Sequence, residues 1–413
     1  MTTNPQTTDP RTTHPRRIVF LGTHGQYNIG DELLLETFLT QLGPEHHYVI
    51  NSYDPAFTRG QLAGRFDVEV IDTSRDRMQL ARELLRCDLL CFGGGSIIKE
   101  LYASTGRHRY STLAMILAIV TFTHWIARRP IAMLNVGVGP VRTKQGHRLA
   151  KLILSQVDEL SVRDDKSFTT CRALGLEPLR ATDAVFSADR HWLLGDSSGA
   201  AVPTTEIDHS GPLRIALNLN YDIENPDNWE LFLERLASGL EQVHANHPVE
   251  LHALPMQVGF KQHDDAEILD AFAARVPAIP MHRHELRTYV DAAQLIENCD
   301  LLVSERLHAI VMASILGVPS YVLAYDVKVR ELAGMLDLAS WTTDINEPFA
   351  ATEFADRLSA LIEQRADVGV HVRDRSAALG VEARRNFDTA RQWVATTAAK
   401  AAARTKATTK AKV

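Results

Sequence analysis

Basic side chains and a histidine follow two successive apolar segments in the second half of the chain. Arg306 and His308 come after the segment 301–304, and Lys328 comes after the segment 320–324. A guanidinium binds carboxylate or phosphate oxygens, an ammonium adds a compact positive charge, and an imidazole can transfer a proton near neutral pH. A lone histidine on an apolar helix would be interpreted as a core residue. With two basic residues nearby, the pattern favours a site for a small anionic substrate and a proton-transfer step.

Glycine-rich loops follow three apolar segments in the first half, at 22–32, 92–96 and 137–140. Glycine lets the backbone approach a ligand closely, and a helix that follows presents free N–H groups to an anion. Close packing of a helix on a sheet also uses glycine, so each loop alone leaves both interpretations open. We predict a backbone cradle or an acceptor-side surface from Gly25, Asn28, Gly30, Gly93, Gly94, Gly95, Ser96 and Gly139.

Two further charged residues lie at the ends of predicted strands. Asp31 falls in the first turn of a helix, where an acid either stabilises the helix end or acts in chemistry. Arg163 ends the apolar segment 159–162, where it binds an anion or pairs with a neighbouring aspartate. No metal site is expected, because His282 and His284 are better interpreted as a solvated strand end than as ligands.

The spacing of apolar segments predicts two doubly wound, Rossmann-like α/β domains with parallel sheets and a ligand cleft between them. A segment rich in Gly, Ser, Thr and Pro separates the two patterns. Expected strands lie at 17–22, 47–52, 67–71, 88–92, 131–136, 159–162, 213–219, 249–254, 278–281, 301–304 and 320–324.

The same patterns divide the chain into six segments. They are a disordered arm at 1–15, an N-terminal Rossmann-like domain at 16–193, a linker at 194–212, a C-terminal Rossmann-like domain at 213–345, C-terminal helices at 346–397 and a basic disordered tail at 398–413. The tail is interpreted first as a solvated segment. The alternative is peripheral contact with an anionic membrane surface.

Composition excludes several classes of protein. The 413 residues are 45% hydrophobic and 23% charged with a net charge of -7, which is typical of a globular protein and argues against a surface devoted to nucleic acid. The four cysteines are too scattered for a disulfide framework and are expected to be buried thiols. The N-terminus lacks the apolar segment of a signal peptide, and the apolar stretch 113–126 is shorter than the roughly 17 residues of a membrane span. A cytoplasmic protein is expected.

Six motifs occur in the order seen in one enzyme family. They are Asn28–Glu32 (NIGDE), Gly93–Ser96 (GGGS), Val138–Pro140 (VGP), Ser161–Asp164 (SVRD), Arg306–His308 (RLH) and Asp326–Val329 (DVKV). From about residue 18 to 338, the chain therefore resembles the polysaccharide pyruvyl transferase family. The resemblance implies a fold like that of the two-domain GT-B glycosyltransferases. It also implies a transferase that moves pyruvate from phosphoenolpyruvate to two hydroxyls of a sugar in a cell-wall or exopolysaccharide precursor, forming a ketal and releasing phosphate.

The resemblance also assigns roles to residues. It implies proton transfer by His308, an acidic role for Asp31, donor binding by Arg163 and Lys328, and an acceptor side on the N-terminal domain; no cofactor or metal is expected. Arg306 would add positive charge for phosphoenolpyruvate. Family members often carry an arginine after the first strand of the second domain, whereas this chain has Asn218, which brings a hydrogen bond without charge.

Two other functions remain open at this point. One is a GT-B-type glycosyltransferase that uses a nucleotide sugar, and the other is a catalytically silent protein that binds anionic sugars. Many nucleotide-sugar enzymes hold the donor ribose with a carboxylate in the second domain. The predicted helix 307–316 has no acid and the next loop carries Lys328, which favours a small, highly anionic donor.

Overall fold

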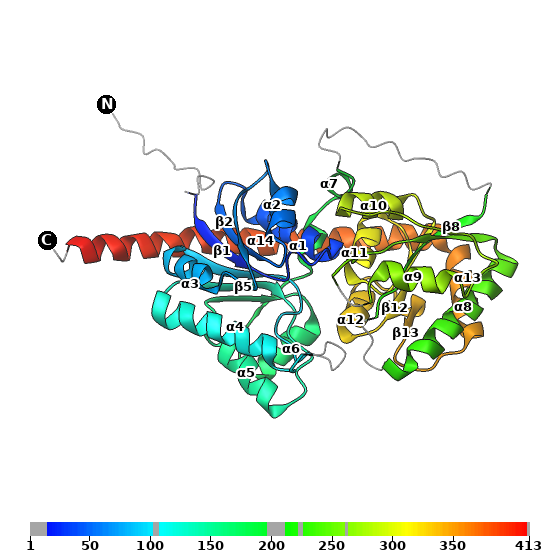
Figure 1. The fold of residues 1–413 in the computed structure, drawn as a ribbon, viewed down its shortest axis with the longest axis horizontal. Helices are drawn as coiled ribbons and strands as arrows, with labels where there is room; N and C mark the ends of the chain where they lie inside the picture. Colours follow the sequence, from blue (N-terminus) through cyan, green and yellow to red (C-terminus); the bar gives the residue numbers. More distant parts are fainter. Residues whose placement is uncertain (1–14, 102–106, 196–210, 222–225, 261–262, 411–413) are drawn as a thin grey trace.

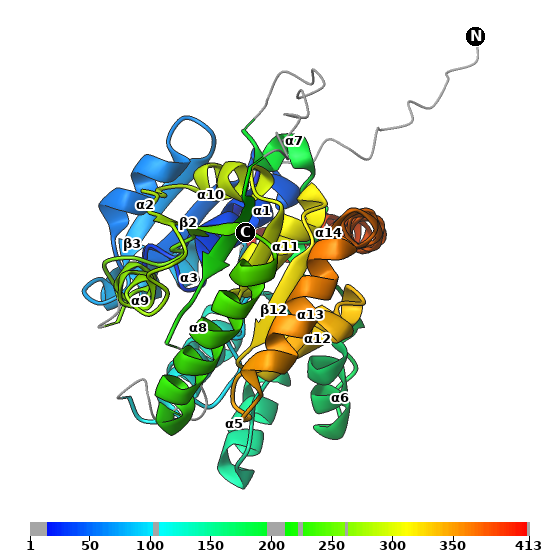
Figure 2. The same cartoon turned by 90° about the vertical axis from the view of Figure 1, so that its right-hand side faces the viewer.

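The computed structural model describes residues 15–101, 107–195, 211–221, 226–260 and 263–410. The predicted N-terminal arm and most of the predicted linker lie outside these residues. The described chain forms two parallel sheets with helices packed around them (Figures 1 and 2). This arrangement agrees with the α/β fold expected from the sequence.

The first sheet has seven strands in the order β3-β2-β1-β4-β5-β6-β7. Its strands are β1 (Arg17–Leu21), β2 (His47–Ser52), β3 (Asp67–Asp72), β4 (Leu89–Gly93), β5 (Ile131–Val136), β6 (Glu159–Val162) and β7 (Leu179–Arg180). The helical elements of this half are α1 (Ile29–Leu42), α2 (Pro55–Leu62), α3 (Arg77–Arg86), α4 (Ser111–Thr121), the π-helical turn η2 (Phe122–Ala127), α5 (Lys144–Leu154), α6 (Asp165–Ala173), η3 (Ala184–Ser187) and α7 (Arg190–Leu193).

The second sheet has six strands in the order β10-β9-β8-β11-β12-β13. Its strands are β8 (Leu213–Asn218), β9 (Val249–Ala253), β10 (Met281–His282), β11 (Leu301–Ser304), β12 (Ser320–Ala324) and β13 (Thr342–Asp344). The helical elements are η4 (Pro226–Asn228), α8 (Trp229–Asn246), α9 (Asp265–Ala273), α10 (Tyr289–Glu297), α11 (Leu307–Leu316), α12 (Val327–Met335), η5 (Ala339–Trp341), α13 (Ala351–Glu363) and α14 (Arg365–Lys410).

The strand order of each sheet reverses once. In the first sheet the reversal lies between β1 and β4, and in the second it lies between β8 and β11. Crossover connections leave the sheet in opposite directions at such a point, so a crevice opens at the carboxyl ends of the strands. Both sheets therefore offer a ligand site at the ends of their central strands.

Several elements differ from the sequence-based expectation. In place of the strand expected at 278–281, the structure has only the two-residue strand β10 at Met281–His282. The strand does not extend further toward the N-terminus because Pro280 has no N–H to donate to the sheet. The short edge strands β7 and β13 were not predicted, since two or three residues carry no periodicity. The tail expected to be disordered from residue 398 is helical to Lys410, and its Ala-rich segment 398–403 has high helix propensity.

Helix α14 runs along both halves of the molecule (Figure 1). It follows α13 of the second half and reaches back to the first, where the rings of Phe387 and Phe38 of α1 pack 5.2 Å apart. Arg391 Nη1 donates a hydrogen bond to the carbonyl oxygen of Gln41 at 2.6 Å. Tyr289 of α10 also bridges the halves by donating to Glu36 Oε1 at 2.7 Å. These contacts place the two sheets against each other.

All four cysteines are buried and free, as expected from the sequence. Burial raises the pKa of the Cys87, Cys171 and Cys299 thiols to about 12. They are therefore neutral thiols at physiological pH. Among the described residues, no helix combines the length and the apolar composition required to cross a bilayer.

Candidate active site

A cavity of about 920 Å³ lies where the carboxyl ends of the two sheets meet. The ends of β1, β4 and β6 contribute to its wall from the first sheet, and the ends of β11 and β12 contribute from the second. The structure brings many of the predicted site residues to this cavity: Asn28, Asp31, Ser96, Arg163, Arg306, His308 and Lys328, together with Gly30 and Gly95.

An ionic cluster crosses the boundary between the two halves. Arg163 Nη1 donates to Asp183 Oδ2 at 3.2 Å, and Arg163 Nη2 donates to Ser96 Oγ at 3.0 Å. Nε2 of His308 lies 3.8 Å from the same Asp183 oxygen. All of these side chains except Ser96 are largely buried. Asp183 thus connects Arg163 of the first half to His308 of the second.

His308 lies in the first turn of α11 and packs against the N-terminal turn of α1. A Cβ atom at Gly30 would overlap the imidazole, so this glycine is required for the close approach of the two helices. Burial lowers the pKa of His308, and the neighbouring Asp183 and Asp31 partly offset that effect. The His308 imidazole of the free protein is therefore neutral at pH 7.

Lys328 is the second basic group that faces the cavity. Its Nζ lies 3.3 Å from Asp326 Oδ2 and 4.9 Å from the centre of the Tyr325 ring. Burial by itself lowers the pKa of Lys328, but the charge of Asp326 and contact with Tyr325 outweigh burial and raise it above its usual value. Lys328 consequently remains protonated throughout the physiological range.

Arg306 and Asn218 serve mainly to join elements of the second half. Arg306 Nη2 and Nε donate to both carboxylate oxygens of Asp265, at 2.6 and 3.2 Å. Asn218 is fully buried, donates to the carbonyl oxygen of Leu254 and accepts from the Arg306 amide. Asn218 is not among the described residues that line the cavity, and the charge of Arg306 is largely balanced by Asp265.

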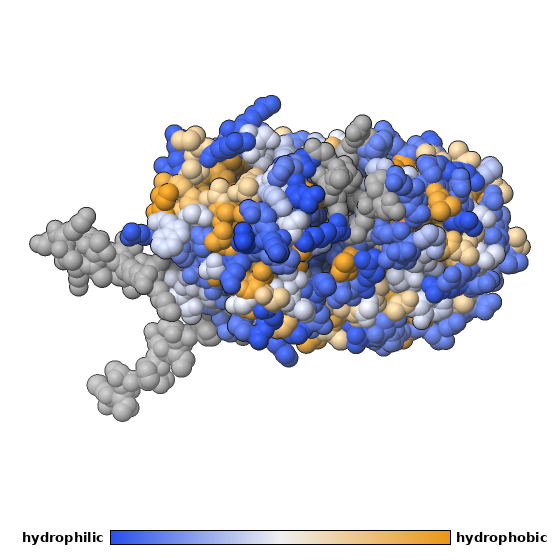
Figure 3. Space-filling view, turned by 90° about the horizontal axis from the view of Figure 1, so that it is seen from below, coloured by the Kyte–Doolittle hydropathy of each residue, from blue (hydrophilic) through white to orange (hydrophobic). Residues whose placement is uncertain are grey.

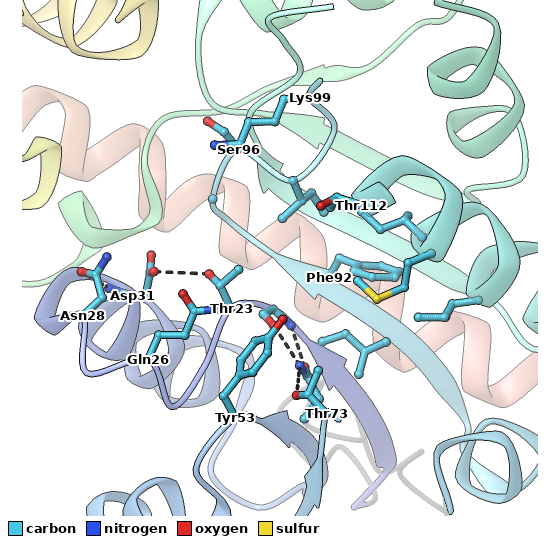
Figure 4. Close-up of a pocket in the computed structure, with 18 of the residues that line it drawn as sticks. Thr23, Gln26, Asn28, Asp31, Tyr53, Thr73, Phe92, Ser96, Lys99 and Thr112 are labelled. Atoms are coloured by element: carbon cyan, nitrogen blue, oxygen red, sulfur yellow. Dashed lines mark hydrogen bonds between the residues drawn. The ribbon is translucent and has the colours of Figure 1, made fainter. Parts of the chain in front are cut away.

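Asp31 projects from the first turn of α1 toward Thr23, whose hydroxyl donates to it at 3.3 Å (Figure 4). Asn28 accepts hydrogen bonds from the amides of Gly30 and Asp31 and so caps the helix. Asn28 therefore serves as the helix cap, and Asp31 lines the cavity. Burial raises the pKa of Glu32 to about 7, and its Oε1 accepts from Gly25 N at 2.7 Å, which fixes the loop.

The remaining predicted glycines support packing. Gly93 and Gly94 lie against the Phe20 and Leu34 side chains, and Gly25 lies against Ser52. Gly95 has a φ of +68° and lines the cavity, and a Cβ atom there would meet the Ile97 side chain at 3.7 Å. Gly25, Gly93, Gly94 and Gly139 are not among the described residues that line the cavity.

Sequence reasoning missed two features of the site. Asp183 is the first, and it follows β7, a two-residue strand without periodicity, so no sequence signal marked it. The second is an apolar arm of the cavity between α3 and α4. It is lined by Leu80, Leu84, Met115, Ile116, Ile119 and Phe122.

A separate group of side chains lies on β9 and β10. Ligand atoms of Glu250, His252 and His282 all lie within 4.8 Å of one another. His252 was not singled out from the sequence, and its Nδ1 lies 3.0 Å from His284 Nε2. Arg214 Nε lies 3.5 Å from Glu250 Oε1 and already balances part of the carboxylate charge. The absence of a metal at His282 and His284 therefore stays a prediction.

Solved structures place this fold in the GT-B class. One similar structure is UDP-GlcNAc 2-epimerase from Neisseria meningitidis bound to UDP-GlcNAc, with 11% identity, a TM-score of 0.58 and coverage of 90% of this chain and 98% of that one. Another is a glycosyltransferase from Rickettsia africae ESF-5, with 11% identity, a TM-score of 0.54 and coverage of 92% and 98%. At this identity the likeness shows the fold alone.

The family is shown by comparing the amino-acid sequence with models of protein families. The family model for polysaccharide pyruvyl transferase matches residues 28–327, which contain every residue of the ionic cluster. The chain belongs to the polysaccharide pyruvyl transferase family. No curated protein sequence matches the chain.

Proposed function

We propose that this protein transfers pyruvate from phosphoenolpyruvate to two hydroxyls of one sugar in a cell-wall or exopolysaccharide precursor, forming a cyclic ketal and releasing phosphate. The observation that carries the proposal is that Arg163, His308 and Lys328 line one cavity, with Asp183 contacting both Arg163 and His308. Phosphoenolpyruvate has a carboxylate and a phosphate around an enol carbon. Arg163 and Lys328 would bind these anions, although each also pairs with an aspartate, Asp183 and Asp326 respectively. His308 would supply the titratable group for the carbon.

The first step would be protonation of the methylene carbon of phosphoenolpyruvate. His308 is neutral in the free protein, but the negative charges of a bound donor would favour the imidazolium and raise the pKa of His308. Donor binding and protonation of His308 are then coupled. Arg163 and Lys328 would hold the carboxylate and the phosphate while His308 gives its proton to the carbon.

The second step would be attack by the acceptor. Once the methylene becomes a methyl group, the adjacent carbon is electron-poor and bonds to a sugar hydroxyl, whose proton passes to Asp31. A second hydroxyl of the same sugar then displaces phosphate, and its proton leaves with the phosphate or through His308. The backbone of Gly95 and the side chains of Thr23 and Ser96 line the same cavity as Asp31 and would position the sugar.

Donor identity can be tested by ligand-dependent unfolding. Phosphoenolpyruvate at about 100 times its dissociation constant should add ~2.7 kcal/mol to the free energy of unfolding, measured as a raised thermal midpoint. Lys328→Met should lose most of this increase, because the ammonium at the cavity is removed. Arg330→Met is the matched control on the same helix, since Arg330 pairs with Asp344 and should leave the increase intact. Stabilisation by UDP-GlcNAc alone would contradict the proposal and favour a glycosyltransferase.

The reaction should slow as the pH rises. His308 must carry a proton, and burial keeps its pKa in the free enzyme below the usual value of 6.5. We therefore expect kcat/KM for phosphoenolpyruvate to increase as the pH is lowered from about 8 toward 6. The decline of kcat should begin at a higher pH, because the bound donor raises the pKa. Steady-state rates across this pH range measure both kcat/KM and kcat. A kcat/KM that rises with pH would mean that His308 acts as a base.

A further inference from the structure

A second surface of the first half has a charge opposite to that of the whole protein. Residues 101–157 contain eight basic residues and no aspartate or glutamate, although the full chain has a net charge of -7. These residues include α4, η2 and α5. The basic residues are Arg107, Arg109, Arg128, Arg129, Arg142, Lys144, Arg148 and Lys151.

Helix α3 packs beside this segment and is also rich in basic residues. Arg129 of the loop after η2 donates to the carbonyl oxygen of Leu85 in α3 at 2.7 Å, and Gln156 after α5 donates to Thr121 of α4 at 3.4 Å. The basic residues of α3 and the turn before it are Arg75, Arg77, Arg82 and Arg86. The helix's acid Glu83 is buried and bound to Arg17, so it contributes little negative charge to the surface, whereas Asp76 of the turn offsets one of these positive charges.

Large apolar side chains are exposed among these basic residues. Trp125 and Ile126 are 67% and 64% exposed on η2, and Met78 is 73% exposed on α3. Leu85, Met115 and Leu152 are also exposed. Seen from below, hydrophobic residues gather on the half of the molecule that holds the first sheet (Figure 3). We call the surface of α3, α4, η2 and α5 the basic apolar face.

We propose that the basic apolar face binds the surface of an anionic phospholipid bilayer. Exposed Trp, Ile, Leu and Met side chains enter the boundary between headgroups and acyl chains, while arginine and lysine bind the anionic headgroups. A second copy of the chain is disfavoured as the partner, because a symmetric contact would place this positive face against itself. A nucleic acid would match the charge but would leave the aliphatic side chains without an apolar partner.

The basic apolar face borders the cavity of the candidate active site. Met115 of α4 and Arg77 of α3 belong to the face and also line the cavity. A protein bound through this face would therefore hold the cavity at the bilayer surface. The inference concerns the membrane contact alone and does not depend on the proposed pyruvyl transfer.

The test is sedimentation of the full-length protein with vesicles, without substrate. The protein should bind vesicles of phosphatidylcholine mixed with phosphatidylglycerol much more strongly than phosphatidylcholine alone, and high salt should weaken binding. Trp125→Glu with Ile126→Glu should lower the partition coefficient by more than about tenfold, because two apolar side chains no longer enter the bilayer. Arg82→Gln and Arg148→Gln should each lower it by about fivefold.

Two controls show whether binding is specific to this face. Val370→Glu with Val381→Glu introduces the same charges at exposed apolar positions of α14 and should leave vesicle binding unchanged. Replacing the five basic residues after 398 by glutamine tests the C-terminal segment. The proposal is overturned if the native protein does not bind anionic vesicles, or if only the C-terminal variant loses binding. It is also overturned if the Trp125 and Ile126 substitutions abolish self-association, measured by light scattering, rather than vesicle binding.

Discussion

Replacing His308 by alanine should reduce kcat for pyruvyl transfer by about 10²–10⁴-fold, the usual contribution of a general acid. The imidazole lies beside Asp183 in the cavity and is the group that the proposed mechanism uses to protonate the donor carbon. Phosphate release from phosphoenolpyruvate in the presence of acceptor measures the rate. Donor affinity should change much less, because the two cations remain.

The interpretation of that variant depends on an intact fold. His371→Ala is a suitable control, since His371 is an exposed histidine of α14 and should tolerate the change with normal turnover. Thermal unfolding of both variants shows whether the structure is retained. Near-normal kcat for a folded His308→Ala protein would remove His308 from the mechanism.

Gly30→Ala should lower kcat by about 10²-fold, even though it adds only a methyl group. The new Cβ would overlap the His308 imidazole and push α1 and α11 apart or turn the ring. A misplacement of about 1 Å at a reacting group costs a factor of this size. Overpacking should also reduce the free energy of unfolding by ~1–3 kcal/mol. Kinetics and thermal unfolding measure the two effects.

The matched control for this substitution is Gly60→Ala. Gly60 lies in α2, and no atom stands within 4 Å of its Cβ position. Alanine should there raise the free energy of unfolding by about 0.4–1 kcal/mol and leave kcat unchanged. If Gly30→Ala behaved like Gly60→Ala, the contact between α1 and His308 would have no role in turnover.

Much of the architecture follows from local sequence patterns. Most of the apolar segments that form central strands are followed by a loop that contains glycine or a charged residue. Because the strands are parallel, these loops all lie at the same edge of the sheet. For that reason the amino-acid sequence alone was enough to predict that Arg163, His308 and Lys328 lie near one another, and all three line the cavity. Helices α8 and α11 were equally predictable, because both bury a long apolar surface.

Other parts of the site depend on how the two sheets face each other. Asp183 contacts His308 across the boundary, and no spacing in the sequence relates these two residues. Arg306 was predicted to bind the donor from its residue type and position, and Asn218 from the family resemblance. Their actual partner Asp265 lies on another helix, so only the folded chain shows that the guanidinium is already engaged.

The course of α14 has a consequence for how the chain is made. Phe38 lies in the core of the first half, yet Phe387 covers it from the far end of the sequence. During synthesis the ribosome releases the N-terminal half long before this aromatic partner exists. Part of the core of the first half therefore stays uncovered until residue 387 has been synthesised, and a contact of such long sequence separation is slow to form.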